Sequence, residues 1–142
     1  MRRFALVVVT TVLAAAGACG NDGDTAPTSS SAHAGITLTT DSPRAEVTAP
    51  VSGPAERLVF RVASIVNAGD DALIIRAAVE GVEVGRATPY PPTRADTYEM
   101  PVPEGLRLTK QAAVVFELLP PDAGARLSAG IRIDIDRVGF RD

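Results

Sequence analysis

The sequence predicts an all-β fold: an antiparallel β-sandwich of the immunoglobulin-like or jelly-roll-like kind. Short apolar runs rich in β-branched residues follow one another, and Gly, Pro, Asp and Asn separate them. The clearest run alternates apolar and polar residues, which is the period of a strand with one buried face. Roughly eight such runs at short spacing are typical of a sandwich.

The predicted strands follow one another within a single domain, residues 35–142. They cover residues 36–40, 45–49, 58–66, 72–79, 82–84, 96–102, 112–119 and 131–136. The run at 72–79 also fits helical spacing, but it is short, uncapped and β-branched, so a strand is favoured. Phe60, Phe116 and Phe140 each lie in or beside an apolar run, and we expect all three to be buried.

The last strand carries three isoleucines on one face: Ile131, Ile133 and Ile135. Beyond them the alternation changes phase, because Val138 and Phe140 fall on the opposite parity. A β-bulge near Asp136-Arg137 would return both side chains to the core face. The sequence therefore predicts a bulge within this strand.

Residues 1–18 have the features of an export signal, with Arg2 and Arg3 before an apolar stretch at 4–18. That stretch is shorter than the roughly 18–20 apolar residues of a spanning helix. Ala16-Gly17-Ala18-Cys19 resembles the lipobox of bacterial lipoproteins, and the arginine- and alanine-rich composition resembles the actinobacterial type. The resemblance implies cleavage before Cys19, acylation of Cys19 (palmitate among the acyl groups) and anchoring to the extracytoplasmic face of the cell membrane. An ordinary secretory signal that leaves a free thiol is the alternative.

We expect residues 19–34 to form a flexible, disordered tether, because they contain no large apolar residue with which to build a core. Without the signal, 12 basic residues face 17 acidic ones, a net charge near −5. Nucleic-acid binding depends on clustered basic residues and is disfavoured. We expect contact with the lipid bilayer through the acylated Cys19, because two or more acyl chains anchor a protein stably.

The chain has few of the side chains, cysteine and histidine above all, on which catalytic and metal sites depend. The single cysteine is Cys19 and the single histidine is His33 in the tether, so we expect no disulfide, catalytic triad, transition-metal site or cofactor. Carboxylates remain. Asp70-Asp71 lies in a predicted turn, and Asp134 and Asp136 share a strand face near Arg132, where ion pairs are expected. A weak calcium site stays open as an alternative.

The segment from Tyr90 to Tyr98 is the predicted interaction surface. It contains both tyrosines of the chain, two consecutive prolines and Arg94. Tyrosine and arginine are enriched in binding hot spots, and proline stiffens a loop. Tyr90, Arg94 and Tyr98 are therefore the predicted contact residues. The alternative is a connecting loop whose tyrosines cap the edge of the sandwich.

Part of the chain resembles the C-terminal β-sandwich domain of tyrosinases and polyphenol oxidases. The similar segments are Ile74 to Gly81, Val84-Gly85 before an aromatic-proline stretch, Val114 to Pro120 and Gly130 to Val138. In that family the domain covers a dicopper catalytic domain and places one side chain in its entrance. The resemblance implies a sandwich fold and an accessory role, and it implies no activity because the six copper-binding histidines are absent.

Together these observations predict a membrane-anchored extracytoplasmic lipoprotein. It acts as a non-enzymatic binding or interaction module for a protein partner in the cell envelope. A small-ligand or carbohydrate-binding sandwich is the alternative, although a chain without tryptophan offers little aromatic platform. An enzyme would instead be expected to show a concave pocket with perturbed carboxylates.

Overall fold

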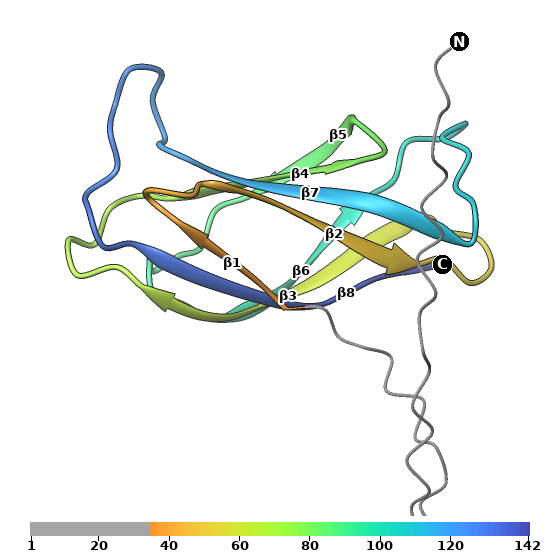
Figure 1. Ribbon diagram of the computed structural model, residues 1–142, viewed down its shortest axis with the longest axis horizontal. Coiled ribbons are helices and arrows are strands. Elements are labelled where there is room, and N and C mark those ends of the chain that lie inside the picture. The colour runs from red at the N-terminus through yellow and green to blue at the C-terminus, as the bar shows by residue number, and fades with distance from the viewer. Residues whose placement is uncertain (1–34) are drawn as a thin grey trace, which may run out of the picture.

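The computed structural model describes residues 35–142, which form two four-stranded antiparallel sheets packed face to face (Figure 1). The strands are β1 (Ile36–Thr39), β2 (Arg44–Pro50), β3 (Arg57–Val66), β4 (Ile74–Val79), β5 (Val82–Ala87), β6 (Asp96–Pro101), β7 (Gln111–Leu119) and β8 (Arg132–Arg141). No helix occurs among residues 35–142, so the all-β sandwich is confirmed. The predicted signal peptide, lipidated Cys19, His33 and tether lie outside the described residues.

The strand order identifies the sandwich as a jelly roll. One sheet has the order β1-β8-β3-β6 and the other has the order β2-β7-β4-β5. The first strand therefore pairs with the last, the second with the last but one, and so on: β1 with β8, β2 with β7, β3 with β6 and β4 with β5. A long antiparallel hairpin folded at residues 80–81 and rolled up gives this pairing, which is the jelly-roll topology and not the immunoglobulin one.

The run that also fitted a helix forms strand β4. Ile75, Ala77 and Val79 on this strand are fully buried, whereas the residues between them are half-buried. β4 pairs with β7 on one side and with β5 on the other. An inner strand of a two-layer sandwich turns alternate side chains toward the second sheet, which is the burial pattern observed.

Aromatic rings form the centre of the core between the two sheets. Phe60 of β3 and Phe116 of β7 are fully buried and meet edge to face, with their ring centroids 4.9 Å apart. These two rings come from different sheets, so their contact joins the layers. Phe140 is half-buried against the same core, so the prediction that it would be buried is only partly correct.

The β-bulge predicted in the last strand is present in β8. Val59 of β3 faces Gly139, but Arg61 faces Asp136, so β8 contains one residue more than β3 over this interval. Arg137 adopts a φ of 51° there. Leu58 and Phe140 then face each other across the sheet and both pack toward the core. The bulge corrects the phase of the apolar residues, as the sequence pattern required.

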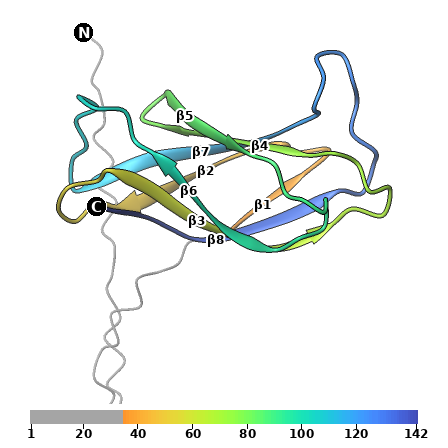
Figure 2. The same ribbon diagram turned by 180° about the vertical axis from the view of Figure 1, so that it is seen from behind.

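The connecting loops divide between the two ends of the sandwich. Loops 40–43, 67–73, 88–95 and 120–131 lie at one end, on the left in Figure 1, and we call it the Tyr90 end. Loops 51–56, 80–81 and 102–110 lie at the opposite end together with the C-terminus, and we call it the Glu104 end. The view from behind shows the same division (Figure 2).

Candidate functional site

Tyr90 is the most exposed large apolar or aromatic side chain of the described residues, at 82%. It lies in the loop between β5 and β6, where the Tyr90-Pro91 peptide bond is cis. The amide of Arg94 donates a hydrogen bond to the carbonyl oxygen of Pro91 over 2.9 Å and closes a turn. The loop therefore has a defined backbone and presents one aromatic ring to solvent.

The other two predicted contact residues have different surroundings. Arg94 lies in the same loop and forms an exposed ion pair with Asp96, with 3.1 Å between Nη2 and Oδ2. Tyr98 lies on β6 directly opposite Phe60, and the two rings stack with centroids 5.6 Å apart. Burial raises the pKa of the Tyr98 phenol, and the charge of Asp96 raises it further. Tyr98 is thus a structural cap on the core, whereas Tyr90 projects from the loop.

Asn67 ties the loops of the Tyr90 end together, and its side chain is nearly inaccessible, at 4% exposure. Its amide nitrogen Nδ2 donates to the carbonyl oxygens of Asp71 (2.9 Å) and Pro92 (3.3 Å), and Oδ1 accepts from the amide of Asp71. The Asp71 carboxylate accepts a hydrogen bond from the amide of Ser128, and the Thr40 hydroxyl donates to the carbonyl oxygen of Ser128. Side chains thereby connect all four loops of this end.

Sequence reasoning assigned residues 67–71 only to a turn and missed this network. Asp70 lies in the turn that was expected there and adopts the left-handed conformation, with a φ of 50°. The sequence does contain a feature that points to this network. Asn67 follows an apolar strand, and an amide side chain at such a position needs hydrogen-bond partners once it is buried. Which partners it finds depends on the fold, since Pro92 lies 25 residues away.

The charged outer face around β8 behaves as predicted. Hydroxyls of Ser64 and Thr37 each donate to Asp134 over 2.7 Å, and with Arg132 they hold the pKa of this carboxyl below its usual range. Asp136 pairs with the guanidinium of Arg61 through both carboxylate oxygens. These contacts account for both carboxylates as parts of a solvated, ion-paired sheet face. No cluster of potential metal ligands occurs within residues 35–142.

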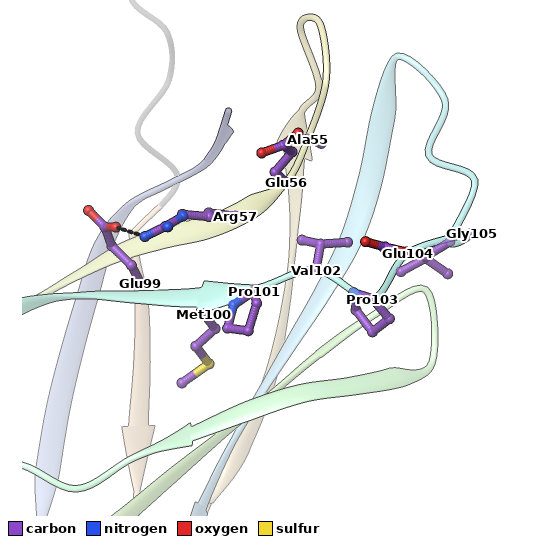
Figure 3. A pocket seen from close by; sticks show the side chains of 11 residues that line it. Ala55, Glu56, Arg57, Glu99, Met100, Pro101, Val102, Pro103, Glu104 and Gly105 are labelled. Carbon is purple, nitrogen blue, oxygen red and sulfur yellow. Dashed lines mark hydrogen bonds and ion pairs between the residues drawn. The ribbon is translucent and has the colours of Figure 1, made fainter.

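A cavity of about 560 Å³ opens at the Glu104 end and was not anticipated from the sequence (Figure 3). It lies between the start of β3, the end of β6 and the loop that follows β6. Its lining residues are Ala55, Glu56, Arg57, Glu99, Met100, Pro101, Val102, Pro103, Glu104, Gly105 and Leu106. They come from two segments more than 40 residues apart, so no local motif marks the site.

Comparison with known proteins assigns no family to the chain, so the fold and these surfaces are the basis for proposing a function. No protein-family model matches the chain, and no curated protein sequence matches it significantly. Within residues 35–142, no helix has the length and apolarity needed to cross a membrane. The class that the geometry defines is a jelly-roll domain with braced loops at one end and a cavity at the other. The resemblance to tyrosinase C-terminal domains stays a prediction beyond the sandwich fold.

Proposed function

We propose that this protein is a lipid-anchored binding module of the cell envelope and that its Tyr90 end recognises a protein partner. The observation that carries the proposal is Tyr90 itself, an aromatic ring 82% exposed on a hydrogen-bonded loop. Tyrosine supplies a large contact area with few torsions to order, and a pre-formed loop loses little entropy on binding.

The direction of β1 supports this assignment of the binding end. β1 runs toward the Tyr90 end, because Thr39 faces Arg132 and continues into loop 40–43. Residue 35 therefore precedes β1 on the side away from that end. An anchor that reaches the domain through residue 35 leaves the Tyr90 loop free to meet a partner. The acidic surface charge favours a protein partner over a nucleic acid.

Lipidation of Cys19 is the first part of the proposal to test. A Cys19→Ser variant should incorporate no labelled fatty acid and should leave the membrane fraction, whereas the native chain should show both properties. Stable membrane association of the variant, or absence of label in the native chain, would refute the anchor.

Recognition through Tyr90 is tested by crosslinking in intact membranes followed by mass spectrometry. Tyr90→Ala or Arg94→Ala should weaken partner binding by more than about 1 kcal/mol, which is about fivefold, with nearly unchanged thermal stability. Val82→Ala is a matched control, because Val82 is 41% exposed next to the loop at residues 80–81 of the opposite end.

Tyr98 supplies a second control with the opposite expected result. Tyr98→Ala removes the ring that stacks on Phe60, so it should lower stability. If Tyr90→Ala lowers stability and leaves the recovered partners unaltered, then the loop is structural and the binding surface lies elsewhere.

A further inference from the structure

The cavity at the Glu104 end has the size of a small-molecule site. Its volume of about 560 Å³ falls within the range of about 300–1,000 Å³ that is usual for ligand pockets. Figure 3 shows Arg57 of β3 and the two residues before it on one side of the space, and the loop after β6 on the other. The site lies at the opposite end from the Tyr90 loop, and its assignment is independent of the function proposed for that loop.

Apolar side chains form the floor of the cavity. Met100 is 4% exposed, and Val102 and Leu106 are half-buried against the core. The Met100 side chain packs closely against Gly85 of β5, where an added Cβ would lie only 3.1 Å from the thioether sulfur. A methionine at the base of a pocket packs well against an aromatic or aliphatic body, because its thioether is polarisable and contacts ring edges favourably.

The walls of the cavity are joined by backbone hydrogen bonds. The amide of Val102 donates to the carbonyl oxygen of Glu56 over 2.8 Å, and the amide of Glu56 donates to the carbonyl oxygen of Arg141 over 3.0 Å. These bonds connect the start of the loop after β6, the segment before β3 and the end of β8. The space is therefore pre-formed, which lowers the entropic cost of binding.

The charges at the rim favour a cation. The lining includes three carboxylates and one guanidinium. Glu99 pairs with Arg57 over 3.3 Å and also with Arg141, so this one carboxylate engages both guanidinium groups. Glu56 and Glu104 have no ion pair within residues 35–142. An anion would meet these two carboxylates, whereas an ammonium or guanidinium group would be attracted to them.

We propose that this cavity binds a small organic cation, with its apolar body against Met100, Val102 and Leu106 and its charged group toward Glu56 and Glu104. The apolar floor accounts for the body and the uncommitted carboxylates for the charge. No covalent chemistry is involved.

The experiment follows the Met100 methyl group by NMR in the full chain labelled with ¹³C-methyl methionine. The chain contains two methionines, Met1 and Met100, and a Met100→Leu variant assigns the floor signal. Benzylammonium chloride should shift that signal in a saturable way. Benzyl alcohol, which has the same ring without the charge, should bind at least about fivefold more weakly, and benzoate should produce no saturable shift.

A double variant, Glu56→Gln with Glu104→Gln, keeps the size of both side chains and should weaken benzylammonium binding at least about fivefold. Glu46→Gln is the matched control, because Glu46 is an exposed carboxylate of β2 with no ion pair in the described part of the chain. Its affinity should equal that of the native protein. The proposal is overturned if benzylammonium gives no saturable shift, if benzyl alcohol binds equally well, or if the double variant binds like the native protein.

Discussion

Replacing Phe116 by alanine is expected to remove a large part of the stability of the domain. The ring is fully buried on β7 and meets Phe60 edge to face at 4.9 Å. Its neighbours across the strands are Ala45 and Ala77, whose methyl groups are too short to fill the space that the ring leaves. A buried Phe→Ala substitution costs about 3–5 kcal/mol, and poor closure of the cavity places this one at the upper end.

The expected loss is large against the about 5–15 kcal/mol that stabilise an ordinary domain. An unfolding entropy of about 2.1 cal/mol/K per residue converts it to a fall in Tm of about 13–22 °C for a domain of this size. Urea unfolding followed by circular dichroism measures the free energy directly, and an unaltered slope against denaturant would show that both states keep their compactness.

Phe140→Ala is the matched comparison, because the same substitution is made where the ring is only half-buried. It should cost about half as much or less, since less area is removed from water. If Phe116→Ala costs no more than Phe140→Ala, the inward phase of β7 and the central position of the Phe60–Phe116 contact are refuted.

Three further results are expected. Asn67→Ala should lower the free energy of unfolding by about 1–3 kcal/mol and speed amide exchange at Asp71, because half-buried backbone groups lose their partner; unchanged exchange would contradict the bracing role. The depressed pKa of Asp134 implies a contribution to stability that is present above about pH 4, the ordinary pKa of an unfolded aspartate, and is lost as the pH falls through the lower folded pKa. When Tm is measured from about pH 2 to about pH 7, it should therefore decline less steeply on the acid side for Asp134→Asn than for the native chain. Parallel profiles would argue against this contribution of Asp134 to stability. Gly85→Ala should cost about 1 kcal/mol and shift the Met100 methyl signal, because the new Cβ lies 3.1 Å from the sulfur, whereas an unmoved signal would mean that the two sheets are looser at this edge.

Local alternation was sufficient to predict several details of the fold. Short length and β-branching predict a strand rather than a helix at 72–79, and β4 occupies Ile74–Val79. The bulge in β8 followed from a change of parity between Ile135 and Val138, and the register with β3 contains it. Such features are readable because a strand with one buried face must repeat every two residues.

The predicted contact segment contains a difference that local reasoning could not resolve. Tyr90 and Tyr98 look equivalent in the sequence, yet one is 82% exposed and the other stacks on Phe60. The difference arises because Tyr98 lies on β6 opposite Phe60, a residue 38 positions earlier in the chain. Residue type alone cannot separate an exposed anchor from a cap on the core.

The sequence by itself determined the all-β class, most strand positions, and the buried face and the bulge of the last strand. All of these depend on residues close together in the chain. The tertiary structure alone decided the jelly-roll pairing, the Asn67 network and the cavity at the Glu104 end, because each joins distant segments: Thr37 meets Asp134 across 97 residues, and Arg57 meets Glu99 across 42. Such contacts form only when the sheets assemble, and nothing in the local pattern records which distant strand a given strand will find.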